Sequence, residues 1–162
     1  MELNEAIRFD PSYGEAYLEL ASVRESTGDL GEAERVYDTA ARIPAVRARA
    51  QEGRARVLKS AGRVSEAFRD LESSVELEPT RQRLERLVEW YVERRAWPAA
   101  LVASRRLLAL LDGGPKPERD AARLKVQALV VLAGEVDPVV AGANVHGGWV
   151  RRSLATMARR PR

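Results

Sequence analysis

The chain has 162 residues, of which 45% are hydrophobic and 31% charged, with a formal net charge of +3 and no cysteine. This length suits one domain with a sizeable core. The lack of cysteine excludes disulfides, thiolate chemistry and cysteine-ligated zinc sites.

The sequence shows neither an export signal nor a membrane span. It begins without a basic stretch followed by an apolar run, and no apolar stretch reaches the ~18 residues that a span needs. A cytoplasmic protein is therefore expected. Only three of the 27 basic residues are lysine, and this bias indicates a GC-rich genome and a bacterial source.

A pattern that returns after 34 residues dominates the first two thirds of the chain. The segment TGDLGEAERVYDTA, residues 27–40, returns as AGRVSEAFRDLESS, residues 61–74. Around both segments the apolar residues are three, four or seven positions apart, which is helical spacing. Each unit is therefore predicted to be two helices joined by a short turn that carries Gly28 or Gly62.

The predicted elements follow in chain order as a half unit at 1–11, three units at 12–44, 45–79 and 80–111, and a divergent region at 112–162. The first two complete units end near Pro44 and Pro79. The turn of the third unit lacks the glycine and is predicted to be one residue shorter. We expect these segments to form a single helical-repeat domain over residues 1–162.

Small residues occupy the positions where the predicted helices cross. Larger side chains there would force neighbouring helices apart from their usual ~8–10 Å spacing. These residues are Ala21, Ala33, Ala55, Ala67 and Ala100. Ser12 and Glu15 have the spacing of a capping box, and Ser65 is expected to cap a second helix.

The last region departs from the repeat. A break at residues 112–118 precedes a helix predicted from about Pro117 to Ala133 and ended by Gly134. Leu124 and Val131 belong to its expected packing stripe. A loop and a short basic helix near residues 149–160 are then expected to complete a C-terminal capping helix pair.

The repeat resembles the tetratricopeptide repeat (TPR), whose units also have 34 residues, a turn glycine and small residues at the helix crossings. The resemblance covers about residues 1–111 and implies an all-α, right-handed TPR-like α-solenoid. The second unit departs from the pattern, because Gln51 and Arg54 stand where the family has large apolar residues. A helical bundle with accidental similarity is the alternative.

No pattern of catalysis is present. There is no nucleotide-binding glycine motif, and His146, the single histidine, has no carboxylate neighbour in sequence to orient it. No acidic cluster has calcium-loop spacing. We therefore expect no enzyme, no cofactor and no metal.

The TPR resemblance implies a concave groove, lined by the first helix of each unit, that binds a peptide. The implied lining combines a basic band with more acidic flanks, and we expect it to bind an acidic segment of a partner. The residues carried over by position are Glu15, Leu18, Ser22, Glu25, Arg49, Glu52, Arg56, Lys59, Gln82, Glu85, Glu89 and Glu93.

The sequence lacks the chaperone-tail clamp that some TPR proteins use. Leu18 and Ser22 stand where that clamp has lysine and asparagine, and Gly53 replaces a second asparagine. Only Arg86 is compatible. The expected function is therefore that of a non-catalytic interaction scaffold with a partner other than a chaperone tail.

Two further surfaces remain open as alternatives. An apolar patch of Leu3, Ile7 and Phe9 favours self-association or a protein partner. The basic C-terminal helix offers a contact with anionic membrane or nucleic acid, which would make the chain a peripheral adaptor. Nucleic acid is not favoured, because acids balance the bases over the body and no aromatic residues interleave with the arginines. Membrane is not favoured either, because the tail helix has few bulky apolar residues.

Overall fold

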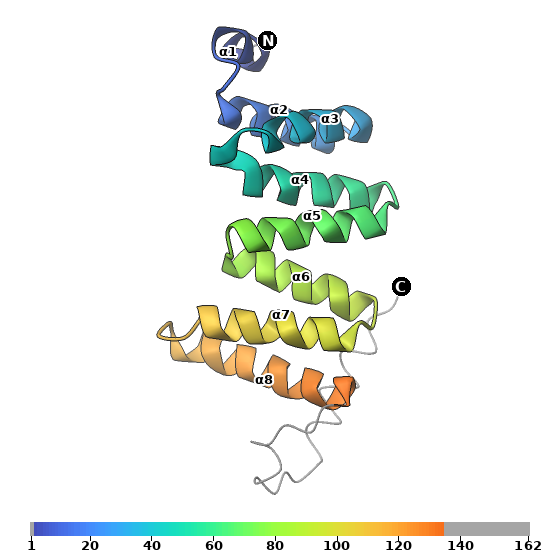
Figure 1. Ribbon diagram of the computed structural model, residues 1–162, viewed down its shortest axis with the longest axis vertical. Helices are drawn as coiled ribbons and strands as arrows, with labels where there is room; N and C mark the ends of the chain where they lie inside the picture. The colour runs from blue at the N-terminus through green and yellow to red at the C-terminus, as the bar shows by residue number, and fades with distance from the viewer. Residues whose placement is uncertain (1, 135–162) are drawn as a thin grey trace, which may run out of the picture. The chain divides into compact units, whose positions relative to one another are not determined.

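The computed structural model describes residues 2–134, which are built from helices and contain no strand (Figure 1). The elements are α1 (Glu2–Phe9), α2 (Gly14–Ser26), α3 (Leu30–Ala41), the 3-10 helix η1 (Pro44–Val46), α4 (Arg47–Ser60), α5 (Val64–Leu77), α6 (Arg81–Glu93), α7 (Trp97–Leu110) and α8 (Lys116–Ala133). The all-helical prediction is confirmed. The predicted basic helix near residues 149–160 lies outside the described residues.

The described residues fall into two compact units that divide between Arg83 and Leu84, within α6. In the first unit α2 pairs with α3 and α4 pairs with α5, and α3 also packs against α4. Ala21, Ala33, Ala55 and Ala67 each have 0% exposure. The predicted close crossings are therefore present at all four alanines. The single repeat domain over residues 1–162 stays a prediction.

The helix at the start of the first unit covers its neighbour only in part. α1 packs against α2, and Leu3 and Ile7 on α1 are half-buried. Phe9 is 94% exposed at the end of the same helix. Self-association through this patch stays a prediction.

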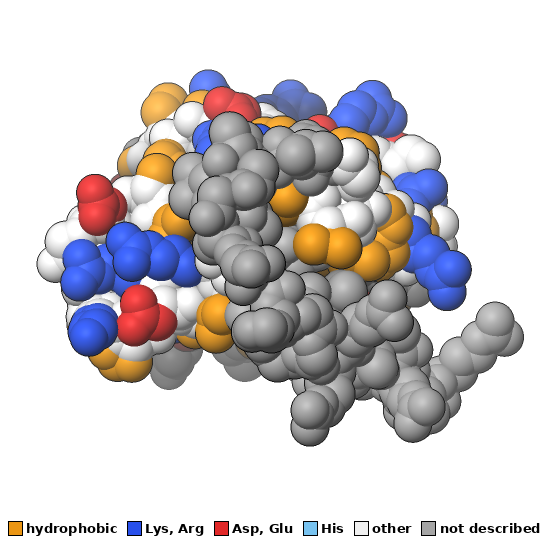
Figure 2. All heavy atoms as spheres, turned by 90° about the horizontal axis from the view of Figure 1, so that it is seen from below, with side chains coloured by type: hydrophobic (Ala, Val, Ile, Leu, Met, Phe, Trp, Pro, Cys, Tyr) orange, Lys and Arg blue, Asp and Glu red, His pale blue; other side chains and the backbone are white. Residues whose placement is uncertain are grey.

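In the second unit α7 and α8 pack against each other. Ala100 has 0% exposure, and α8 ends at Gly134 with φ +71°, as predicted. The predicted stripe on α8 is right at Ala128, which is buried, and wrong at Leu124 and Val131, which are 48% and 54% exposed while Val126 and Leu129 are buried. Apolar residues of α8 lie on several faces of the helix, so their periodicity alone does not decide which face is buried. Figure 2 shows one face of the molecule, on which exposed hydrophobic side chains lie beside lysine and arginine side chains.

The start of α2 differs from the sequence prediction. Ser12 donates from its backbone N and from Oγ to Asp10 Oδ1, at 2.9 and 2.6 Å, which lowers the pKa of Asp10. α2 begins only at Gly14, so Ser12 and Glu15 form no capping box. Ser65 lies inside α5 rather than at its cap. The cap of α3 is Asp29, which accepts from Glu32 N at 3.2 Å.

The turns of the three predicted repeat units each contain one residue in the left-handed conformation. Gly28 and Gly62 have φ of +82° and +78°, and Arg95 takes the same role in the third turn with φ +56°. Arg95 N donates to Val92 O at 3.0 Å, as Gly62 N donates to Lys59 O at 3.0 Å. The third turn therefore keeps the geometry of the others although it lacks their glycine. The predicted shortening is wrong, because three residues separate the two helices in all three units.

Substitutions at these turns should change stability in opposite directions. A residue with a Cβ in the left-handed region is strained by roughly 1–2 kcal/mol. Gly62→Ala should therefore lower the free energy of unfolding by about 1 kcal/mol, and Arg95→Gly should raise it by up to about 1 kcal/mol. Urea denaturation of the full chain measures both, and a destabilised Arg95→Gly variant would contradict the strain at this turn.

Candidate functional site

The first helices of two successive hairpins, α2 and α4, lie side by side in the first unit. Their predicted groove residues are Glu15, Leu18, Ser22 and Glu25 on α2, and Arg49, Glu52, Arg56 and Lys59 on α4. All eight are exposed or half-buried. The structure therefore brings these two sets onto neighbouring helices.

The exposed end of this surface carries a pair between Arg49 and Glu15, which are 34 residues apart. Arg49 Nη1 donates to Glu15 Oε2 at 3.0 Å, and Arg49 Nη2 contacts Glu15 Oε1. The hydrogen bonds lower the pKa of Glu15 and raise that of Arg49. Both side chains are about half exposed, at 47% and 51%. Such solvated pairs add little to stability, so another carboxylate can replace Glu15 at small cost.

A more buried cluster lies further along the same two helices. Arg56 binds Glu25 through two hydrogen bonds, Nε to Oε1 at 3.0 Å and Nη2 to Oε2 at 2.9 Å. The Tyr37 hydroxyl donates to Glu25 Oε2 at 3.0 Å and accepts from Arg56 Nη2 at 3.2 Å. Burial is the main cause that raises the pKa of Tyr37 to about 12. Arg56 is therefore held on both sides by groups of its own chain.

The ring of Tyr37 lies directly against the backbone of α4 at Gly53. A Cβ at Gly53 would lie 2.3 Å from Tyr37 Cε1 and 2.4 Å from Cζ. Tyr37 is only 3% exposed, so its ring has little room to move away. Gly53 stands where the chaperone-tail clamp has an asparagine. In this structure the glycine allows α3 to pack closely on α4.

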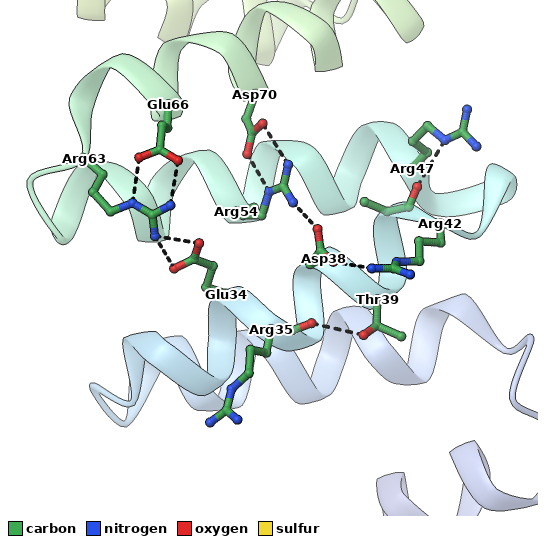
Figure 3. Close-up of polar contacts among 11 residues, drawn as sticks. Glu34, Arg35, Asp38, Thr39, Arg42, Arg47, Arg54, Arg63, Glu66 and Asp70 are labelled. Atoms are coloured by element: carbon green, nitrogen blue, oxygen red, sulfur yellow. Dashed lines mark hydrogen bonds and ion pairs between the residues drawn. The ribbon is translucent and has the colours of Figure 1, made fainter.

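Two arginines bridge α3 and α5 away from the groove residues (Figure 3). Arg54 binds Asp70 with Nε–Oδ2 and Nη2–Oδ1 distances of 2.7 and 3.0 Å, and its Nη1 binds Asp38. Arg63 binds Glu34 and Glu66 in the same manner at 2.6–2.8 Å. Arg54 occupies the position of a family apolar residue, and the structure shows that two carboxylates compensate this departure.

Most of the arginines that crowd the second repeat are therefore engaged within the chain. Arg49, Arg54, Arg56 and Arg63 each bind at least one carboxylate. Arg47 differs, because its only side-chain hydrogen bond within residues 2–134 goes from Nε to the Ala41 carbonyl at 3.1 Å. The basic band that the sequence suggests is thus largely neutralised by acids of neighbouring helices.

The last predicted groove residues lie on α6, which crosses the boundary between the two units. Gln82, Glu89 and Glu93 are exposed and Glu85 is half-buried. The neighbouring Arg83 is only 4% exposed and binds Glu52 Oε2 at 2.8 Å. Arg83 also binds Glu78 Oε2 at 2.8 Å, which lowers the pKa of Glu78. Glu52 is therefore already occupied by a buried cation.

The described part of the chain offers neither a metal centre nor a membrane span. Among residues 2–134 no group of three or more histidine, aspartate or glutamate side chains is placed to hold a metal ion. No helix in the same range is both long and apolar enough to cross a bilayer.

The arrangement is that of known TPR structures. No protein-family model matches the chain, and no curated protein is similar to it in sequence. Among solved structures it resembles YrrB, described as a TPR protein with an unusual peptide-binding site, at 19% identity and a TM-score of 0.65, over 83% of this chain and 67% of that one. It also resembles a putative kinesin light chain of Podosopora anserina with nearly identical TPR-like repeats, at 16% identity and a TM-score of 0.63, over 96% and 82%. This likeness establishes the TPR-like fold.

A methyl group at position 53 should disrupt the contact between α3 and α4. Gly53→Ala places a carbon in steric clash with the edge of the Tyr37 ring, and we expect the free energy of unfolding to fall by roughly 1–3 kcal/mol or more. The matched control is Gly31→Ala on α3, where a Cβ meets no atom within 4 Å. This control should raise stability by up to about 1 kcal/mol. Equal effects in thermal or urea unfolding would contradict the close approach.

The ion pairs of Arg63 should make the free energy of unfolding depend on pH. Hydrogen bonds from Arg63 hold the pKa of Glu66 below its ordinary value of 4.5. As pH falls below that value the unfolded state takes up the proton first, so the free energy of unfolding falls. Arg63→Gln should make this fall shallower between about pH 5 and pH 3.

Arg47→Gln is the control for the pH experiment. It removes the same charge from a guanidinium that has no carboxylate partner among the described residues. Urea denaturation at a series of pH values gives the slope for each variant. A slope that is equal in the wild type and in Arg63→Gln would show that the Arg63 pairs do not form in solution.

Proposed function

We propose that this TPR-like chain is a non-catalytic scaffold that binds a peptide segment of a partner protein on the surface of α2 and α4. The observation that carries the proposal is the pairing of these first helices with their polar residues exposed. The description of YrrB as a TPR protein with a peptide-binding site supports the same use of the fold. A cytoplasmic setting is part of the proposal.

The partner segment is proposed to be acidic, and Arg49 is the residue that would receive it. A partner carboxylate can displace Glu15 because the Arg49 pair is half exposed and because guanidinium and carboxylate form paired hydrogen bonds. Arg56 is less suited, since Glu25 and Tyr37 already hold it on the buried side. The α6 residues of the predicted lining stay a prediction.

Reversing the charge of Arg49 should remove the partner. The chain carrying Arg49→Glu should capture the proteins that the wild type captures in parallel at least about fivefold less in affinity purification with mass spectrometry, because a charge-assisted hydrogen bond becomes a repulsion. Circular dichroism should show an unchanged helical fold, since Arg49 is at the surface.

The control makes the same charge change elsewhere. Arg35→Glu alters a side chain on α3 that is 79% exposed. Its captured proteins should match those of the wild type. If both variants capture the same proteins at wild-type amounts, the assignment of the partner surface to Arg49 is wrong.

A further inference from the structure

A pocket of about 260 Å³ lies between the start of α4 and the end of α5, within the first unit. Its apolar lining comes from Pro44, Ala45, Ala48 and Leu77. Leu77 is a large apolar side chain that remains 50% exposed. We name this site the Leu77 pocket. It lies at the ends of the helices, and Arg49 is the one residue carried over to the groove that also lines it.

The polar lining of the Leu77 pocket carries an excess of positive charge. Arg47, Arg49 and Glu78 complete its wall. Arg47 has no carboxylate partner in the described part of the chain, and its hydrogen bond to the Ala41 carbonyl uses only Nε. In Figure 3 its guanidinium points away from the cluster around Asp38. Both Nη groups thus remain as donors beside the apolar lining.

The single acid of the pocket does not cancel this charge. Glu78 is bound by Arg83, whose Nη1 donates to Glu78 Oε2 and to the Glu78 carbonyl, both at 2.8 Å. Arg83 is 4% exposed and is also bound to Glu52. The end of α5 is therefore fixed in place by a buried cation. Arg47 keeps its Nη groups without a carboxylate, and Arg49 is bound only to Glu15 in a half-exposed pair.

We propose that the Leu77 pocket binds one aliphatic side chain of a partner peptide whose adjacent residue is acidic. The aliphatic group would contact Leu77 and Ala48, and the carboxylate would accept hydrogen bonds from Arg47 and Arg49. Arg49 exchanges Glu15 for this carboxylate. The inference rests on the proposed function and adds to it a sequence preference: an aliphatic residue beside an aspartate or glutamate.

Selection from a random peptide library tests the preference. Immobilised full-length protein is used to select 12-residue peptides by phage display, and the enriched peptides are labelled for fluorescence anisotropy. The expected result is enrichment of aliphatic–acidic pairs. Changing the acid to its amide, or the aliphatic residue to glycine, should each weaken binding about tenfold, as expected for a lost charge-assisted hydrogen bond or a lost buried side chain.

Variants of the chain then locate the binding. Arg47→Ala and Leu77→Ser should each weaken binding of the enriched peptides by about fivefold or more. Arg42→Ala is the control, because Arg42 is an exposed arginine that binds Asp38 outside the pocket. The affinity of Arg42→Ala for the enriched peptides should remain within about twofold of that of the wild type. Circular dichroism confirms the fold of each variant.

The outcomes separate this inference from the proposed function. Enriched peptides that bind Arg47→Ala and Leu77→Ser as tightly as the wild type would overturn the pocket and leave the scaffold function intact. Enriched peptides without an aliphatic–acidic pair would do the same. If the library yields no binding peptide, both the pocket and the peptide-binding function are wrong.

Discussion

The arrangement of the first unit depends on one charged side chain placed between three helices. Arg54 on α4 lies at a position where the resembling family has an apolar residue, and it binds Asp38 on α3 and Asp70 on α5. A guanidinium that is 24% exposed would be costly without partners. The two carboxylates remove that cost and at the same time connect one hairpin to the next.

An ionic contact of this kind specifies register more sharply than an apolar one. Leucine packs against almost any hydrophobic neighbour, whereas the planar fork of arginine needs carboxylates in defined directions. The same device returns at Arg63, which binds Glu34 and Glu66. The acids on α3 and on α5 are each four residues apart, so a shift of one helical position would break both bridges together. These bridges therefore favour specificity of packing, while the alanine crossings allow the helices to approach.

The interval of 34 residues and the small residues were sufficient to predict the hairpins, because backbone periodicity and helix approach depend on local sequence. The ionic bridges were not predicted, since they depend on the relative register of three helices. Asp38 and Asp70 each lie 16 residues from Arg54, one before and one after it. This equal spacing is visible in the sequence, but it predicts a contact only when the packing of the three helices is known. The packing role of Gly53 was not predicted for a similar reason, because the Tyr37 ring that it contacts belongs to the preceding repeat.

The sequence correctly placed the proposed groove residues of the first two units on neighbouring helices, but it did not predict how their charges are paired. From their positions in the repeat, Glu15 and Arg49 were expected on neighbouring helices, as found. The arginines were expected to form one basic band. The structure separates them by burial. Arg56 belongs to a cluster with Glu25 and the hydroxyl of Tyr37, a residue that is buried. Arg49 is solvated.

Tyr37 connects the core with this surface. Its ring packs on Gly53 inside the first unit, and its hydroxyl fixes the Glu25 and Arg56 pair at the surface. A ligand that displaced Glu25 would also leave a buried hydroxyl without its acceptor, which costs more than breaking a solvated pair. Charge exchange with a partner is therefore easiest at the end of α4 that carries Arg47 and Arg49. The packing of the core thus restricts where on α4 a ligand can bind.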